Sequence, residues 1–211
     1  MRIQWGDPPK SDPPPNVPSD LNTITGPTPS QAFKLATLAG IALLAVLCIA
    51  LGNWASYASE KGRMASASDT ATPWLAPAIV LITFIPLHEF IHLLGQPGWG
   101  ITRNSVLAIW PTRLRFGVYY EGCMSRKRWL IMRLAPLVVL CLLPALLIAL
   151  MQTLSSSPDI QVGLIVMMVV NALGSGGDIV AAAIILRQVP ASASLCFREG
   201  QAYWRPAHRL M

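Results

Sequence analysis

The stretch from His88 to His92 reads H-E-x-x-H and lies inside a long apolar segment. On a helix, residues four apart project from one face about a turn apart, so the imidazoles of His88 and His92 can bind the same Zn²⁺ ion. Glu89 lies beside them, where its carboxylate can take a proton from a metal-activated water and later return it. The pattern predicts zinc-dependent hydrolysis of peptide bonds.

Catalytic zinc takes three protein ligands and keeps a further position open, so the two histidines need another donor. We predict that Asp178 is this donor, because it is a carboxylate in a second apolar segment and follows a glycine-rich stretch. Gly174, Gly176 and Gly177 would let that segment approach the histidine helix closely. Asn171 is predicted to hold a substrate backbone or the oxyanion, although a simple hydrogen bond to a neighbouring helix explains it equally well.

The elements that must position these residues are predicted to be transmembrane helices. The chain has 211 residues, of which 53% are hydrophobic and only 12% charged, and the apolar residues form long blocks. Four segments, at about 33–56, 74–95, 130–151 and 162–187, are long enough to cross a bilayer. The sequence therefore predicts an all-α polytopic membrane protein with four spans and the candidate ligands at similar depth.

Lys and Arg are concentrated between residues 103 and 133 and absent near 152–161. Four spans would put both termini on one side, and by the positive-inside rule this bias predicts that they are cytoplasmic. The expected location is the bacterial cytoplasmic membrane. The expected organisation is a disordered Pro-rich cytoplasmic tail over 1–31, a transmembrane metalloprotease-like domain over 32–188 and a cytoplasmic C-terminal tail over 189–211. Residues 1–31 lack a hydrophobic region, which predicts that the first span is an uncleaved anchor.

A short β-hairpin is predicted between the second and third spans. Apolar side chains alternate with other residues from Leu114 to Tyr120, after the run from Val106 to Trp110. An exposed strand edge could pair with an unwound substrate segment through backbone hydrogen bonds. An amphipathic loop on the membrane surface is an equally good interpretation of the same residues.

The net charge and the cysteines indicate which binding partners to expect. The net charge of +6 comes from basic residues that flank apolar blocks, which predicts contact with anionic lipids and no nucleic-acid binding. The four cysteines show no metal-ligand spacing, and we expect no disulfide framework. The predicted partners are the lipid bilayer and a membrane-protein substrate.

Three sequence features together resemble a membrane family of zincin peptidases related to the site-2 proteases, which cleave within membranes. They are His88 to His92, the stretch from Ser125 to Pro136, and Asn171 to Asp178. The resemblance implies zinc ligands at His88, His92 and Asp178 and a catalytic role for Glu89. Site-2 proteases usually have a proline before the Asp-Gly pair of the last motif, and this sequence has none there.

Two other interpretations compete with a protease. A non-proteolytic zinc-binding membrane protein could keep the same ligands while binding or regulating a partner membrane protein. The same residues could also form a buried polar cluster that only joins helices, although ionisable groups at membrane depth are usually functional. Haem ligation is disfavoured, because two histidines one turn apart cannot easily reach opposite faces of one haem.

Overall fold

The computed structural model describes residues 1–5, 21–60, 75–110, 115–151, 158–198 and 201–206. The chain forms two compact units. The helical unit comprises Ser30–His88 and Pro136–Val180, and the sheet unit comprises Met1–Pro29, Glu89–Ala135 and Ala181–Met211. The boundaries between the units fall within α2 (Leu75–Gly95), α3 (Arg126–Leu137) and α6 (Gly176–Gln188), and at the first residue of α1 (Pro29–Glu60).

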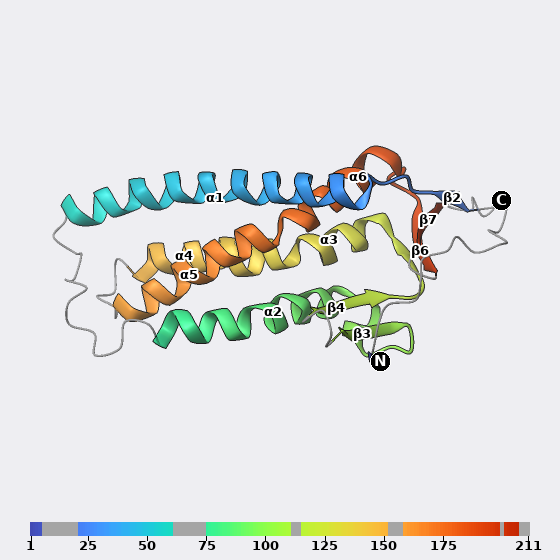
Figure 1. Ribbon diagram of the computed structural model, residues 1–211, viewed down its shortest axis with the longest axis horizontal. Coiled ribbons are helices and arrows are strands. Elements are labelled where there is room, and N and C mark those ends of the chain that lie inside the picture. The colour runs from blue at the N-terminus through green and yellow to red at the C-terminus, as the bar shows by residue number, and fades with distance from the viewer. Residues whose placement is uncertain (6–20, 61–74, 111–114, 152–157, 199–200, 207–211) are drawn as a thin grey trace. The chain divides into compact units, whose positions relative to one another are not determined.

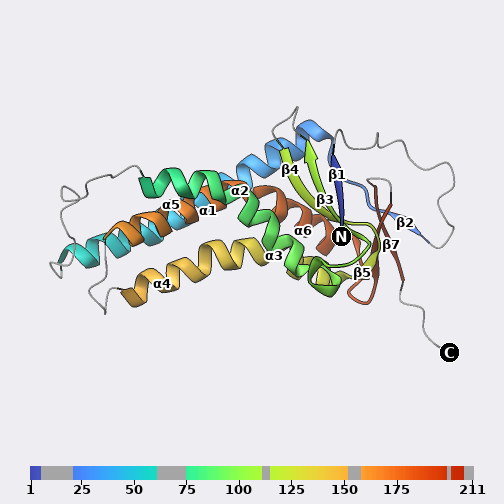
Figure 2. The same cartoon turned by 90° about the horizontal axis from the view of Figure 1, so that it is seen from below.

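The helical unit contains α1 (Pro29–Glu60), most of α2, a π-helical turn at Val138–Leu142, α4 (Leu143–Met151), α5 (Pro158–Gly174) and the start of α6. Helices α4 and α5 lie side by side (Figures 1 and 2). Apolar side chains fill the space between these helices, and the buried ones include Leu140, Cys141, Ile148, Met168 and Ala172.

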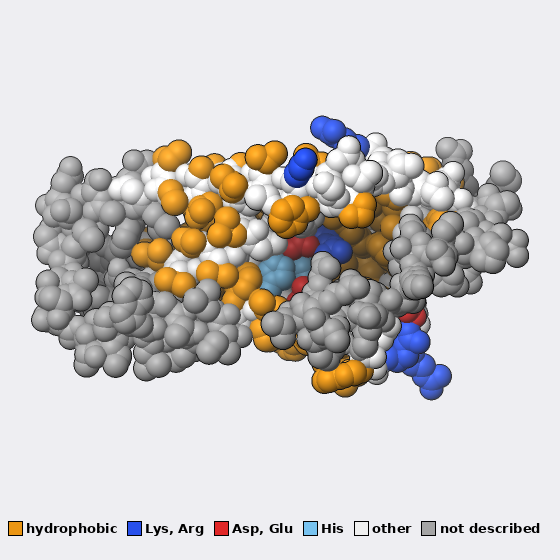
Figure 3. All heavy atoms as spheres, in the orientation of Figure 1, with side chains coloured by type: hydrophobic (Ala, Val, Ile, Leu, Met, Phe, Trp, Pro, Cys, Tyr) orange, Lys and Arg blue, Asp and Glu red, His pale blue; other side chains and the backbone are white. Residues whose placement is uncertain are grey.

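Large apolar side chains also cover the outside of the helical unit, as Figure 3 shows in orange. On α1, Phe33 is 74% exposed and Ile49 is 66% exposed, and on α4 Leu146 is 56% exposed. A water-soluble protein rarely exposes apolar surface so continuously, whereas a lipid-facing surface requires it. The surface is therefore that of a membrane-associated protein.

The prediction of four membrane spans was wrong. Within the described residues, two helices are long and apolar enough to cross a membrane: Pro29–Ile49 and Arg126–Met151. A bent pair of helices, Gly163–Gly174 and Gly176–Gln188, would make a third span if the two cross the membrane together. The fourth predicted segment fails as a straight helix because it bends by 47° at Ser175. Side chains 75–82 of the second predicted segment lie outside the described residues, and the orientation across the membrane stays a prediction.

The sheet unit contains two β-sheets. Strands β1 (Arg2–Trp5), β3 (Ser105–Trp110) and β4 (Arg115–Tyr120) form the first, in the order β1-β3-β4, with β1 parallel and β4 antiparallel to β3. The second has the order β2-β7-β6-β5, from strands β2 (Asn22–Thr23), β7 (Gln201–Arg205), β6 (Ser194–Arg198) and β5 (Cys123–Ser125). All three contacts of the second sheet are antiparallel.

These sheets overturn the prediction of an all-α protein. The strands predicted as a hairpin do pair, with Val106 opposite Tyr119, but they do not stand alone between two helices, because β1 adds a third strand. The predicted tails supply β1, β2, β6 and β7. Residues 6–20 of the N-terminal tail, for which disorder was predicted, lie outside the described residues.

A compact core holds the sheet unit together. Eight buried side chains pack as one cluster: Tyr120, Met124, Trp129, Met132, Ile185, Val189, Ala193 and Leu195. The Trp129 ring stacks on Phe197 with ring centroids 6.3 Å apart.

Tyr119 of β4 links that strand to β1. Its phenol donates a hydrogen bond to Gln4, and burial, reinforced by the neighbouring Glu121 carboxylate, raises its pKa. These contacts fix the strands that follow α2.

Cys123 of β5 and Cys196 of β6 are opposite each other and form a disulfide. The expectation that the cysteines form no disulfide was therefore wrong. Their separation of 73 residues gave no local signal, since the pairing depends on the register of two strands far apart in the sequence. The bond joins the start of α3 to the segment after α6.

Candidate metal centre

Helix α2 positions the two histidines of the H-E-x-x-H motif. His88 and His92 lie four residues apart near its C-terminal end and are 8% and 3% exposed. Both residues belong to the same continuous helix. The Phe84 ring lies against His88, with ring centroids 5.5 Å apart.

Asp178 reaches its position through the break between α5 and α6. The chain bends at Ser175, and α6 begins at Gly176, so that Asp178 lies in its first turn. A Cβ atom on Gly176 would lie 1.9 Å from the carbonyl oxygen of Ala36 in α1, and one on Gly40 would lie 2.8 Å from that of Leu173. Glycines at these positions therefore allow α1 to pack directly on the backbone beside the bend.

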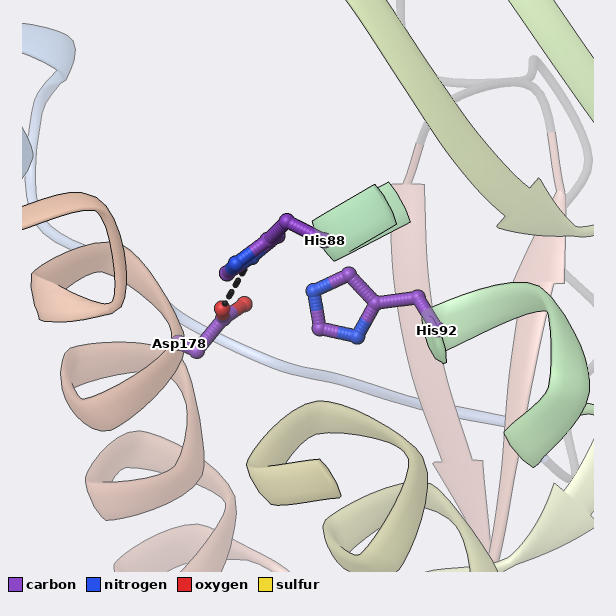
Figure 4. A group of neighbouring side chains, drawn as sticks. All are labelled: His88, His92 and Asp178. Atoms are coloured by element: carbon purple, nitrogen blue, oxygen red, sulfur yellow. Dashed lines mark hydrogen bonds and ion pairs between the residues drawn. The ribbon is translucent and has the colours of Figure 1, made fainter. Parts of the chain in front are cut away.

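His88, His92 and Asp178 come together as a buried group. One ligand atom from each lies within 4.8 Å of the others, and the His88 Nε2 and Asp178 Oδ2 atoms are 3.2 Å apart. Figure 4 shows both imidazole rings and the carboxylate directed toward one another. Ligands of a tetrahedral zinc ion, each about 2.0–2.2 Å from the metal, lie about 3.4 Å from their neighbours. The spacing suits a zinc ion.

The hydrogen bonds of His88 give a second reason to assign a metal site here. Its Nδ1 atom lies 2.9 Å from the Oδ1 atom of Asn171, and Asn171 donates from its Nδ2 atom to the Pro136 carbonyl at 3.2 Å. The Oδ1 atom is an acceptor, so Nδ1 of His88 carries the proton. In the neutral ring, Nε2 then presents a lone pair toward the carboxylate of Asp178 at 3.2 Å. Two lone pairs at that separation require a shared cation, either a proton or a metal ion.

His92 is oriented in the same way by a backbone group. Its Nδ1 atom donates to the carbonyl oxygen of Met132 in α3 at 2.8 Å. Zinc-binding histidines usually donate their second ring nitrogen to a carbonyl or carboxylate, which fixes the ring and makes the first nitrogen more basic. Both histidines of the cluster therefore direct Nε2 toward the metal position.

Glu89 lies outside the group of three candidate ligands. Its Oε2 atom accepts a hydrogen bond from the backbone N–H of Val118 in β4 at 2.9 Å. Within the described residues β4 is an edge strand, since β3 is its only neighbour. The contact therefore holds the motif glutamate against the outward edge of the three-stranded sheet.

The end of α2 is tied to α3 by Arg128. Its guanidinium donates to the carbonyl oxygens of Gly95 at 3.2 Å and Gln96 at 2.7 Å. These carbonyls belong to the last helical residue and the one after it, which have no partner inside the helix. A positive side chain here also complements the negative end of the helix dipole.

Several contributors to the site were not foreseen from the sequence: the Met132 carbonyl, the Val118 N–H and the guanidinium of Arg128. Two of them are backbone groups, which no residue type reveals. The substrate contact predicted for Asn171 stays a prediction; its side chain is fully buried and bonds His88, Pro136 and Cys141. A proline four residues after Met132 was the one available signal, because a proline has no N–H to donate to that carbonyl.

The two histidines from one helix turn and the aspartate from another helix could hold a metal ion, and histidines at this spacing are typical of zinc metallopeptidases. The chain belongs to the family described as "putative zincin peptidase", whose model matches residues 80–194. This match includes all three candidate ligands and Glu89, and the zincin class implies zinc as the metal. Neither curated proteins nor solved structures give a significant match.

Proposed function

We propose that this protein is an intramembrane zinc metallopeptidase that hydrolyses peptide bonds of transmembrane or juxtamembrane segments, in the manner of site-2 proteases. The observation that carries the proposal is the buried cluster of His88, His92 and Asp178. Family membership supports the peptidase class, and the two candidate spans support a membrane setting.

Metal binding and proton transfer would be carried out by different residues of the site. His88, His92 and Asp178 would hold the ion, and Zn²⁺, when bound, polarises a carbonyl and lowers the pKa of a water molecule to about 7. Glu89 would accept a proton from the attacking water and deliver it to the leaving amine nitrogen. The hydrogen bond from Val118 would keep the Glu89 carboxylate in one orientation while it does so.

An extended substrate fits the sheet unit better than a helical one. The N–H of Val118 points away from β3, since it donates to Glu89, and the period of two places the backbone groups of Phe116 on the same side. A peptide in an extended conformation can pair with the backbone groups of Phe116 through main-chain hydrogen bonds, while the N–H of Val118 stays bonded to Glu89. Pairing there would bring its peptide bonds beside Glu89.

The test compares full-length wild type with Glu89→Gln in detergent micelles, using unfolded casein labelled with a self-quenching fluorophore. We expect the wild type to cleave casein only when zinc is present. Glu89→Gln should bind the same amount of zinc, measured by mass spectrometry, and lose cleavage by about 100-fold or more, because the amide cannot accept the proton. Equal cleavage by both proteins would exclude the role proposed for Glu89.

A further inference from the structure

We propose that Pro136 is a positioning residue that sets the orientation of both zinc-binding histidines. It touches neither the ion nor the substrate. Because a proline has no N–H, Pro136 does not donate to the Met132 carbonyl, which binds His92 instead. The carbonyl of Pro136 binds Asn171, which in turn binds His88. The inference rests on the proposed zinc site.

The first connection depends on what a proline lacks. In a helix, the carbonyl of Met132 would accept a hydrogen bond from the N–H four residues later, but residue 136 is a proline and has none. The Met132 carbonyl instead accepts from Nδ1 of His92 at 2.8 Å. A residue with an N–H at position 136 would compete with His92 for this acceptor.

Close packing brings the acceptor within reach. A Cβ atom on Gly95 would lie 2.8 Å from the Cα atom of Met132 and 3.0 Å from its Cβ atom. The glycine at the end of α2 therefore lets the helix lie directly against α3 at the residue that accepts the bond. Arg128 holds the same end of α2 through the Gly95 and Gln96 carbonyls.

The second connection uses the carbonyl of Pro136. Two residues later the helix widens into the π-helical turn at Val138–Leu142, where bonds run over five residues instead of four. The Pro136 carbonyl accepts from Nδ2 of Asn171 at 3.2 Å, and this bond turns the Oδ1 atom of Asn171 toward His88. With Nδ2 donating to Pro136, the amide cannot rotate without losing both bonds.

The experiment measures zinc affinity of the full-length protein by competition with a chromophoric chelator. The variants are Pro136→Ala, Asn171→Leu and, as a matched control, Pro144→Ala. Pro144 is another buried proline of the same continuous helical stretch, but the carbonyl four residues before it belongs to Leu140. We expect Pro136→Ala and Asn171→Leu each to weaken zinc binding by about 10- to 100-fold, as is typical when a partner of a metal ligand is lost. Pro144→Ala should remain within about twofold of wild type.

A second readout separates positioning from a purely structural role. In chelator-treated protein, Pro136→Ala should have an unchanged or higher melting temperature, because an alanine restores the hydrogen bond that proline removes. In Pro136→Ala, zinc affinity should therefore fall while the stability of the metal-free protein stays the same or rises. Bound Co²⁺ should also show weaker visible absorption in both variants, since the histidine rings are no longer held in place.

Three results would overturn the inference: wild-type zinc affinity in Pro136→Ala or, if that variant does not fold, in Asn171→Leu; an equal loss in Pro144→Ala; or a loss that follows a lower melting temperature of the metal-free protein. If Pro136→Ala fails to fold, Asn171→Leu still tests the connection to His88. A wild-type protein that binds no zinc would instead contradict the proposed function itself. The two failures are therefore distinguishable.

Discussion

The Nε2 atom of His88 lies 3.2 Å from the Oδ2 atom of Asp178, although 90 residues separate them in the sequence. Asn171 fixes the proton on the opposite ring nitrogen of His88, so this short approach joins two electron-pair donors. A buried pair of donors is stable only with a cation between them, and His92 supplies a further donor. The relationship underlies the assignment of a metal centre.

The hydrogen bond between Val118 and Glu89 is expected to contribute to turnover. Val118→Pro removes the N–H donor on the outward side of an edge strand, where proline is tolerated. We expect kcat for casein to fall by about tenfold while zinc content stays the same, because the carboxylate loses its orientation. Val118→Ala keeps the backbone N–H and controls for the loss of the side chain. Equal rates for Val118→Pro and Val118→Ala would show that this bond has no part in catalysis.

Gly176 and Gly177 are adjacent but should respond differently to alanine. A Cβ atom at residue 176 would lie 1.9 Å from the Ala36 carbonyl oxygen, whereas at residue 177 nothing lies within 4 Å. Gly176→Ala should therefore destabilise the protein by about 1–3 kcal/mol or more, the usual cost of overpacking. Gly177→Ala should leave stability unchanged or slightly higher, because alanine is the better helix former. Thermal unfolding in detergent measures both, and similar melting temperatures would contradict the packing of α1 beside the bend.

The disulfide between Cys123 and Cys196 is expected to stabilise the sheet unit. It closes a loop of 73 residues, and such a bond typically contributes about 2–4 kcal/mol. Cys123→Ser should lower the melting temperature, and reduction of the wild type should lower it equally. Peptide mapping of protein alkylated during extraction should find these two cysteines linked and Cys48 and Cys141 alkylated. Four alkylated cysteines would contradict the pairing.

The disulfide also bears on the predicted orientation. Disulfides persist in oxidising compartments, whereas the Arg126-Lys127-Arg128 run next to Cys123 is typical of a cytoplasmic flank. The two signals disagree for the same short segment. A linked pair in freshly extracted protein would place this segment on the oxidising side of the membrane and would contradict the prediction that both termini are cytoplasmic.

The metal cluster was accessible to sequence reasoning because its information is local. The spacing of His88 and His92 depends only on the helical repeat, and a carboxylate among apolar residues marks Asp178. The strands of the two sheets were not accessible, since β1, β6 and β7 are short and lie in polar terminal segments. The pairings of β1 with β3, β2 with β7 and β5 with β6 join residues about 70 to 180 apart, which no local pattern encodes. Strands β6 and β7 form a local hairpin, with Arg198 opposite Gln201, and the sequence analysis missed it.

The number of spans was overestimated for a related reason. Apolar composition alone does not distinguish a straight span from two helices joined at a bend, and the stretch from Gly174 to Gly177 contains the break. The glycines were interpreted from the sequence as sites where this segment approaches the histidine helix. Only Gly174 lies against that helix, at Phe84, whereas Gly176 lies against Ala36 of α1 and nothing lies within 4 Å of a Cβ at Gly177. What composition could not indicate is that the same stretch ends α5 and places Asp178 in the first turn of α6.

Zinc content is the most direct test of the metal centre. Mass spectrometry would be applied to detergent-purified, monodisperse wild type, Asp178→Ala and Glu121→Ala, all supplied with zinc during purification. Glu121 is a carboxylate outside the cluster that pairs with Arg2. We predict close to one zinc per chain in the wild type and Glu121→Ala, and a loss of most of the metal in Asp178→Ala. Equal zinc in all three proteins, or little zinc in the wild type, would contradict the assignment of His88, His92 and Asp178 as the metal ligands.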